Sequence, residues 1–144
     1  KKMDYMIAAG GMVINKEGKF LFIYRNKKWD LPKGRKEKNE TVEEAAVSEI
    51  EEETGVKGLR IDHFLDKTYH VFKRNGNYML KITHWFVLRT DYDGKTIPEV
   101  KEGIEAAVWL SADEAKEKLS NCYANIVSLI NKSQILTASG TNKV

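Results

Sequence analysis

The chain has 144 residues, 42% of them hydrophobic and 31% charged, which fits one domain with its own core and leaves no room for a second of ordinary size. The net charge of +3 and the absence of any apolar run near the roughly 18 residues of a membrane helix argue against a nucleic-acid partner and against a membrane-spanning protein. Cys122 is the only cysteine, which excludes internal disulfides and favours a reducing compartment, so we expect a cytoplasmic location.

The first quarter of the chain predicts a β-hairpin. Tyr5–Asn15 is an apolar run, residues 15–18 carry turn residues, and Lys19–Tyr24 is a second apolar run. Gly10 and Gly11 lie inside the first strand. Glycines in a strand interior indicate the close approach of another backbone or of a ligand, and a simple bulge is an equally good interpretation.

Residues 25–36 predict a loop that holds six cations and one anion. A solvated basic loop is the plain interpretation. This loop, however, leads directly into an acid-rich segment, so its cations would lie beside any phosphates that a metal ion holds there. We therefore predict that Arg25, Lys28 and Lys33 bind substrate phosphates.

The segment after this loop predicts a helix with defined ends. Thr41 and Glu44 have the spacing of a capping box, and Gly55 fits a left-handed stop. Glu49 and Glu53 fall within the arc that faces the core, which they share with apolar residues of the same helix, namely Val42, Ala45, Ala46 and Ile50.

Glu52 lies one turn from Glu49 and next to Glu53, so the three carboxylates can converge. Converging like charges repel one another unless a cation lies between them. A hard divalent cation with oxygen ligands is the natural partner, and we predict Mg²⁺, with Mn²⁺ as a substitute. An acid-rich solvated helix is the alternative for an arbitrary run of glutamates.

This region resembles the signature of the Nudix hydrolases. The chain reads Gly34, five residues, Glu40, seven residues, and then the nonapeptide Ser48-Glu49-Ile50-Glu51-Glu52-Glu53-Thr54-Gly55-Val56. The resemblance implies an α+β protein, an α/β/α sandwich with a mixed sheet. It also implies that Glu49, Glu52 and Glu53 hold Mg²⁺, often with the carbonyl of Lys33 or Gly34, and that a diphosphate linkage within a nucleoside diphosphate compound is hydrolysed.

Ser48 is the one departure from the family pattern, which has arginine at this position. The family arginine is thought to hold the catalytic glutamates by charge-assisted hydrogen bonds, which a serine hydroxyl cannot reproduce at that reach. Arg35, Lys36 or Lys33 could supply the missing charge. A binding or sensor module that has lost turnover is the alternative to an active enzyme.

The remainder of the chain predicts further strands and two helices. The expected elements are strands Leu59–Tyr69 and Tyr78–Thr90 around a turn at 74–77, a loop Asp91–Pro98, a strand Glu105–Trp109, a helix that starts at Ser111 with Glu114 as its box partner, and a helix Tyr123–Asn131. We expect a single domain over residues 1–132 and a flexible tail over 133–144.

Substrate choice is predicted from a narrower resemblance. Residues 29–34 and 80–86 resemble the loop and central strand of the diadenosine polyphosphate hydrolases, which implies a small nucleotide as partner. Lys81 would contact phosphate, His84 could act on a leaving phosphate because it titrates near neutrality, and Tyr69 could stack on a base. Core packing is the alternative for His84 and for the aromatic residues.

Two acids are candidates for the base that activates water. Glu52 is the prediction and Glu102 the alternative, because a base must reach the water without being consumed as a metal ligand. Glu105 is a weaker candidate. The same chemistry on ADP-ribose, an inositol pyrophosphate or an oxidised nucleoside triphosphate stays open, as do the oligomeric state and any residues upstream of Lys1.

Overall fold

The computed structural model describes residues 3–136. The strands are β1 (Asp4–Ile14), β2 (Phe20–Arg25), β3 (Lys28–Asp30), β4 (Lys33–Arg35), β5 (Arg60–Arg74), β6 (Asn77–Arg89) and β7 (Ala106–Leu110). The α-helices are α1 (Val42–Thr54), α2 (Ala112–Lys118) and α3 (Ala124–Ser133), and the short 3₁₀ helices are η1 (Val100–Glu102) and η2 (Leu119–Asn121). No helix in this part of the chain is long and apolar enough to cross a membrane.

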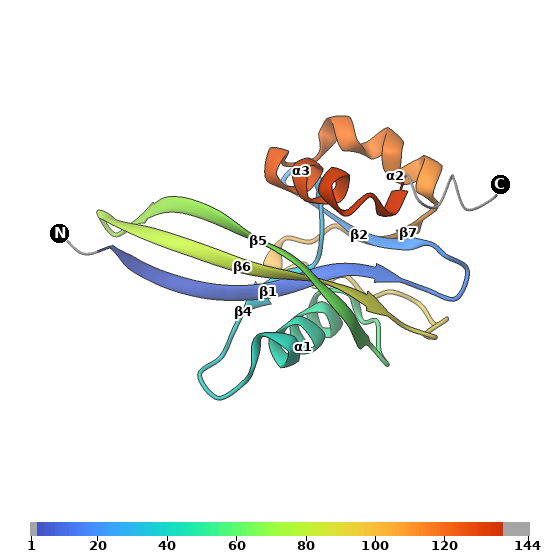
Figure 1. Cartoon of the computed structure of the whole chain (residues 1–144), viewed down its shortest axis with the longest axis horizontal. Helices are drawn as coiled ribbons and strands as arrows, with labels where there is room; N and C mark the ends of the chain where they lie inside the picture. The colour runs from blue at the N-terminus through green and yellow to red at the C-terminus, as the bar shows by residue number, and fades with distance from the viewer. Residues whose placement is uncertain (1–2, 137–144) are drawn as a thin grey trace.

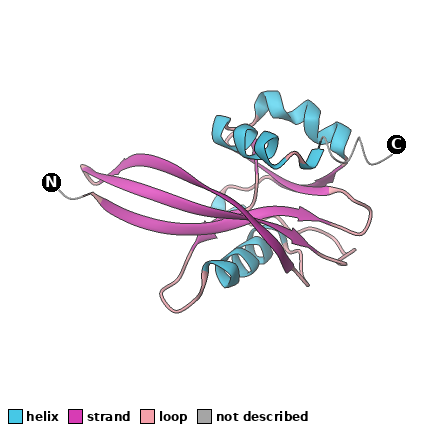
Figure 2. Ribbon diagram, viewed as in Figure 1, coloured by secondary structure: helices cyan, strands magenta, loops and turns pink. Residues whose placement is uncertain are grey.

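The strands form one curled sheet with helices on both faces, and its path runs β3-β2-β1-β6-β5. Figure 1 shows α1 on one face and α2 with α3 on the other, and Figure 2 shows the same layers by type of structure. Strands β1, β5 and β6 extend past the helices as a ribbon (Figure 1). The predicted α+β sandwich with a mixed sheet is confirmed.

The centre of the sheet is β1, which runs parallel to β6 along its whole length. It is antiparallel to β4, with Gly10 opposite Lys33. Gly10 has no room for a side chain, because a Cβ there would overlap with the Pro32 carbonyl. The close backbone approach that the glycines predicted is therefore present, and it brings the 32–35 segment against the middle of β1.

Strand alternation divides the core into two layers. On the α1 face, Val13, Leu21 and Phe86 pack against Ala46 and Ile50. On the opposite face, residues of β1, β2 and β6 pack against α2 and α3, and the fully or nearly buried members include Met12, Phe22, Trp85, Ala115, Ile126 and Leu129. Each helix is thus fixed by apolar packing, and α1 is held with its acidic end over the β4 segment.

Both predicted capping boxes are confirmed. In α1 the Glu44 backbone N–H donates to the Thr41 hydroxyl at 3.0 Å, and the Glu44 carboxylate accepts from the Thr41 backbone N–H. Gly55 ends the helix in the left-handed conformation, with φ of 76°. In α2, Ser111 and Glu114 make the same reciprocal pair.

Three predictions about element bounds were wrong in part. Residues 25–36 are not only a loop, because β3 pairs with β2 across a tight turn at Asn26 and Lys27, both with positive φ, and β4 pairs with β1. Strand β5 continues five residues past the predicted end at Tyr69, because β6 pairs with it up to Arg74. The β1–β2 hairpin is paired only next to its turn, at Ile14 and Phe20, and β4 pairs with β1 further along that edge.

The predicted tail also begins too early. Leu136 is buried and Ile135 packs against the core beside α3, so the chain stays folded beyond residue 133. Residues 137–144, which form the remainder of the predicted tail, lie outside the described residues.

Candidate active site

The predicted acids line one cavity of about 290 Å³, here called the acid cavity. Its lining residues are Gly34, Arg35, Glu37, Glu49, Glu52, Glu53, Glu99 and Glu102. The acids come from α1, from the segment that ends in η1 and, for Glu37, from the loop between β4 and α1. Two backbone hydrogen bonds tie this segment to the end of α1, from Ile97 N–H to the Thr54 carbonyl (2.7 Å) and from Glu99 N–H to the Glu53 carbonyl (3.1 Å).

Glu53 is the most deeply buried of these acids, with 5% of its surface exposed. Its Oε1 accepts a hydrogen bond from the Lys33 backbone N–H at 3.1 Å, and its Oε2 lies 3.9 Å from the Arg25 guanidinium. Burial raises the pKa of Glu53 to about 7, although Lys33 and Arg25 oppose this rise. Additional positive charge nearby would therefore stabilise the ionised form of the Glu53 carboxylate.

Glu49 is a second acid of this cavity with a raised pKa. Burial and then repulsion from Glu52 and Glu53 raise the pKa of Glu49 to about 7. Its carboxylate lies against the backbone of Gly34, where a Cβ would overlap with it. Gly34, the glycine of the motif, thus leaves room for the Glu49 carboxylate directly against its backbone.

The acid cavity adjoins a second cavity, here called the basic cavity, of about 190 Å³. It shares Gly34, Arg35, Glu53 and Glu102 with the acid cavity and adds Met6, Ala8, Arg25, Lys33 and Lys81. Burial, followed by repulsion from Lys33 and Arg25, lowers the pKa of Lys81. This crowding of cations gives the basic cavity the character of an anion site.

A third cavity of about 180 Å³, here called the polar pocket, adjoins the basic cavity through Lys33 and Lys81. It is lined by Asp30, Lys33, Thr68, His70, Lys81, Thr83, Trp85, Tyr123, Asn125 and Ile126. These residues come from β3, β4, β5, β6 and the start of α3. Three charged side chains, Asp30, Lys33 and Lys81, line it together with hydroxyl, amide, imidazole and apolar groups, so it offers polar and apolar contacts to an organic group beside the cations.

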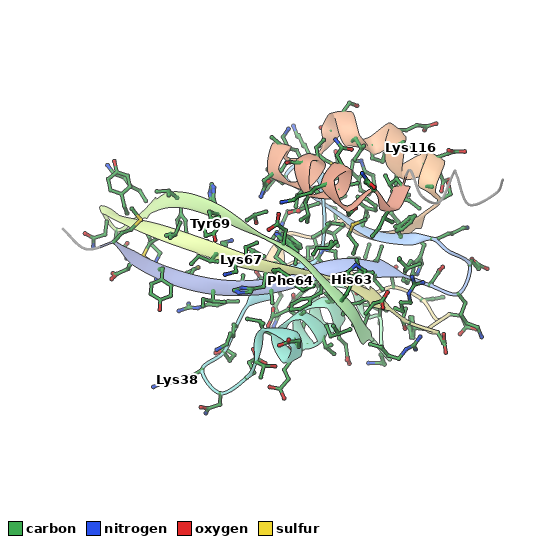
Figure 3. The ribbon with its side chains drawn as sticks, in the orientation of Figure 1. Lys38, His63, Phe64, Lys67, Tyr69 and Lys116 are labelled. Atoms are coloured by element: carbon green, nitrogen blue, oxygen red, sulfur yellow. The ribbon has the colours of Figure 1, made fainter. Side chains whose placement is uncertain are left out.

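The structure does not bring all predicted substrate residues together. Lys28 places its ammonium 5.7 Å from the centre of the Tyr123 ring, at the edge of the polar pocket. Tyr69 is 62% exposed on β5, along the ribbon that extends past the helices (Figure 3). Because Tyr69 is opposite Ile82 in the sheet, it lies on the α1 face and away from the face that carries Lys81.

His84 is also on the α1 face, one residue out of phase with Lys81 and Thr83. Burial and then the charge of Lys67 lower the pKa of His84. Its Nδ1 is buried without a hydrogen-bond partner among the described residues. None of the three cavities includes His84.

Sequence reasoning missed several residues that the structure places at the three cavities. Glu99 lines the acid cavity, and its pKa is raised by burial and by Glu102 and Glu52. His70 and Thr68 line the polar pocket because they are opposite Lys81 and Thr83 in the β5–β6 hairpin. Counting outward from the Asn75-Gly76 turn gives these same pairs, so the signal was present in the sequence.

Ser48 takes no part in the acid cavity. It is exposed, and its hydroxyl donates to the Ala45 carbonyl one turn earlier on α1, at 3.3 Å. Of the three cations predicted to replace the motif arginine, Lys33 contacts Glu53 through its backbone and Arg35 lines the cavity. Arg25 of β2 is the guanidinium nearest to a motif glutamate.

The donor set suits a hard divalent cation. Within residues 3–136, no three His, Cys, Asp or Glu side chains are grouped closely enough to hold a metal ion as they stand. The carboxylates nevertheless share one cavity, and those of Glu49 and Glu53 are held in surroundings that disfavour ionisation without added positive charge. An all-oxygen set of this kind matches Mg²⁺ or Mn²⁺.

Comparisons with known proteins identify the family of this chain. The family model of the NUDIX domain matches residues 4–130, so the chain belongs to the Nudix family. An RNA pyrophosphohydrolase of Sphingopyxis alaskensis is 30% identical over 102 residues, covering 61% of this chain and 65% of the relative. A MutT-like protein of Streptomyces ambofaciens is 29% identical over 122 residues, covering 83% of this chain and 73% of the relative.

Solved structures show the same fold. A C. elegans Ap4A hydrolase in a binary complex superposes with a TM-score of 0.67 at 21% identity, covering 93% of this chain and 98% of that one. A MutT protein from Methanosarcina mazei Go1 gives 0.65 at 19% identity, covering 100% and 99%. The chain spans about 65% of the length of the Sphingopyxis relative, so activity and substrate are matters for proposal.

Proposed function

We propose that the protein is a Mg²⁺-dependent pyrophosphohydrolase that cleaves a diphosphate linkage within a nucleoside diphosphate compound. One observation supports this most strongly: a cavity lined by carboxylates shares four lining residues with a cavity lined by four cations, Arg25, Lys33, Arg35 and Lys81. Carboxylates suit a metal and a water nucleophile, and cations suit the phosphates that carry the scissile bond.

The order of the cavities orients the substrate. Phosphates would lie in the basic cavity, where Lys33 and Lys81 counter charge that grows on the phosphate oxygens in the transition state. The organic group beyond them would enter the polar pocket, between Thr68, His70 and α3. The phosphorus nearest the acid cavity would then be the one attacked.

Glu49, Glu52 and Glu53 would hold the cation, with the Gly34 carbonyl beside them. When bound, a divalent cation neutralises phosphate charge and makes a water molecule more acidic. Glu52 is exposed at the cavity and is our candidate for the carboxylate that accepts the water proton, with Glu102 of η1 as the alternative. The charges of Glu102 and Glu52 raise the pKa of Glu99, so we include Glu99 among the acids of the site.

Dinucleoside polyphosphates are the first substrate class to test. The chain shares the fold of a protein named Ap4A hydrolase, and the polar pocket offers a place for the nucleoside next to the phosphates. The 5′ end of RNA is the second class, because two relatives, from Sphingopyxis and Erythrobacter, are named RNA pyrophosphohydrolase. A fold that binds nucleotides without turnover is the remaining alternative, given Ser48.

A substrate panel tests this proposal. The panel holds diadenosine tetraphosphate, triphosphorylated RNA, ADP-ribose, an oxidised nucleoside triphosphate and an inositol pyrophosphate, each with Mg²⁺, with Mn²⁺ and with excess chelator. We expect hydrolysis of at least one compound, loss of activity in chelator and a loss of well over about tenfold in the Glu52→Gln variant. Hydrolysis that persists in chelator would refute the metal-assisted mechanism, and binding without hydrolysis would favour the sensor alternative.

The same reaction in ¹⁸O-labelled water identifies the atom that the water molecule attacks. Label recovered in a phosphate product supports attack of water on phosphorus. Label on a ribose oxygen would rule the mechanism out.

A further inference from the structure

Asp30 is a buried acid for which neither the fold nor the Nudix motif accounts. It lies at the end of β3, with 5% of its surface exposed. A carboxylate is rarely buried to this degree unless it is paired, because removing its charge from water costs several kcal/mol. Its partners therefore identify what it does.

Those partners are the two cations that also contact Glu53. The Asp30 Oδ2 accepts a hydrogen bond from the Lys33 ammonium at 2.8 Å and lies 3.9 Å from the Arg25 guanidinium. Its Oδ1 accepts from the Leu31 backbone N–H at 2.8 Å, which fixes the orientation of the carboxylate. On their other side, Arg25 and the Lys33 backbone reach the two oxygens of Glu53, at 3.9 and 3.1 Å.

These contacts form a closed network of two acids and two cations from β2, β3, β4 and α1. All four side chains are largely buried, with side-chain exposures of 7% for Asp30 and Glu53, 18% for Arg25 and 16% for Lys33. Charge-assisted contacts in such surroundings are less screened than on the surface. Arg25 is held at a further point, where its guanidinium donates to the Glu102 carbonyl at 3.3 Å.

The network performs a task that the motif assigns to another residue. At position 48 the family arginine would hold the catalytic glutamates, and Ser48 here is exposed and bonded only to its own helix. Arg25 reaches Glu53 from strand β2 through its Nη1. The Nη2 of the same guanidinium lies near the Asp30 carboxylate.

We propose that Asp30 is a positioning residue which, through Arg25 and Lys33, holds Glu53 in place and so replaces the arginine missing at position 48. Asp30 faces the polar pocket and not the acid cavity, so it acts through these two cations and not on the reacting atoms. The assignment of Glu53 as a metal ligand rests on the proposed function, whereas the network itself does not.

Asp30→Asn tests this role, because asparagine keeps the shape and the Oδ1 acceptor for Leu31 and removes the charge. Loss of a supporting partner of a metal ligand typically costs about ten- to a hundredfold in metal affinity or activity. We expect Mn²⁺ to bind about tenfold more weakly, as measured by electron paramagnetic resonance without substrate. We expect kcat to fall at least about tenfold while KM changes less than about threefold.

Asp62→Asn is the matched control. Asp62 also pairs with an arginine, at 3.1 Å from the Arg89 side chain, but it is exposed on β5 outside the three cavities. We expect this variant to leave Mn²⁺ affinity and kcat unchanged.

A double-mutant cycle separates positioning from general destabilisation. In a background that carries Arg25→Gln and Lys33→Met, Asp30→Asn should have almost no further effect on Mn²⁺ affinity, because the groups through which it acts are absent. Equal losses in both backgrounds, or a lower melting temperature with unchanged Mn²⁺ affinity in the folded fraction, would overturn the proposal.

The motion of Arg25 gives a readout that needs neither metal nor substrate. Nuclear magnetic resonance relaxation of the Arg25 Nε–Hε group should report restricted motion in the unsubstituted protein and in Asp62→Asn, and fast motion in Asp30→Asn. An Arg25 side chain that stays equally rigid in Asp30→Asn would refute the positioning role. If the proposed function were wrong and no substrate were hydrolysed, this measurement would still decide the matter.

Discussion

At the scale of single residues, Glu53 combines burial with a position in a cluster of acids. Its pKa of about 7 is set first by burial, and only the nearby Lys33 and Arg25 limit the rise. A cation beside this carboxylate would recover the free energy that burial of the charge costs. A bound metal ion would therefore stabilise the ionised Glu53 in its buried position.

Glu53→Gln is expected to weaken Mg²⁺ binding and to reduce turnover by well over about tenfold, because a charged ligand is lost from a metal-assisted site. Titration calorimetry and steady-state kinetics at limiting Mg²⁺ measure both. Glu51→Gln is the control, since Glu51 lies on the same helix and pairs with Lys57 at the surface. Near-normal activity of Glu53→Gln at limiting Mg²⁺ would remove Glu53 from the set of ligands.

Ser48→Arg asks whether the departure from the motif limits catalysis. Glu49 has no cation among the causes of its raised pKa, so an arginine one residue earlier on α1 would supply the missing charge. We expect kcat to rise while KM stays within about threefold. Because the arrangement of Arg25, Lys33 and Asp30 is proposed to hold Glu53, an unchanged or lower kcat would show that added charge beside Glu49 does not limit turnover.

At the scale of elements, α1 carries an electrostatic strain that depends on pH. The pKa of Glu53 is about 7 in the folded protein, against an ordinary value of 4.5 in the unfolded chain. The contribution of Glu53 to the free energy of unfolding is fully present below about pH 4.5, where its carboxyl group is protonated in both states. It is lost as the pH rises through about 7, because the carboxyl group ionises at a lower pH in the unfolded chain than in the folded protein. For Glu53 this amounts to at most about 3 kcal/mol.

Metal-free protein should therefore have a lower melting temperature at pH 8 than at pH 5, and Glu53→Gln should reduce that difference. Thermal unfolding in chelator, followed by circular dichroism, measures it. Added Mg²⁺ should raise the melting temperature at pH 8 by binding only the folded state. The same pH dependence in Glu53→Gln as in the unsubstituted protein would assign the effect to other groups.

Local sequence patterns predicted an element wherever neighbouring residues determine the backbone conformation, as capping boxes and tight turns do. Thr41 with Glu44 and Ser111 with Glu114 gave the starts of α1 and α2, and the Asn75-Gly76 turn gave the β5–β6 hairpin. The short strands β3 and β4 were missed because three residues show no alternation. Their pairing depends on β1 and β2, which lie far away in the sequence.

The acids of the site were predictable because they lie on one helix with fixed spacing. The strand residues of the polar pocket were predictable from the register of the β5–β6 hairpin, but Tyr69 and His84 were chosen by residue type without using that register, which places them on the other face. Glu99 and Asp30 had no signal of their own. Each depends on a tertiary contact, Glu99 with the end of α1 and Asp30 with Arg25 and Lys33.

At the scale of the whole molecule, the α2–α3 layer connects the core with the polar pocket. Tyr123, Asn125 and Ile126 at the start of α3 line the pocket, and Cys122, just before them, is buried in the core cluster. Burial raises the pKa of the Cys122 thiol to about 11, and the thiol donates to the Lys118 carbonyl at 3.4 Å. The thiol is therefore shielded while this layer stays packed.

We expect Cys122 in the folded protein to react with a disulfide reagent at pH 8 far more slowly than in denaturant, because only the thiolate reacts and both its formation and its access are blocked. The reaction then proceeds through transient opening of the α2–α3 layer. A non-hydrolysable dinucleoside polyphosphate analogue should slow it further if its nucleoside occupies the polar pocket, because that opening would expel the ligand. The release of the coloured thiolate measures the rate, and Cys122→Ser gives the blank. A fast reaction in the free protein would contradict the packing of this layer, whereas a slow reaction that the analogue leaves unchanged would place the nucleoside outside the polar pocket.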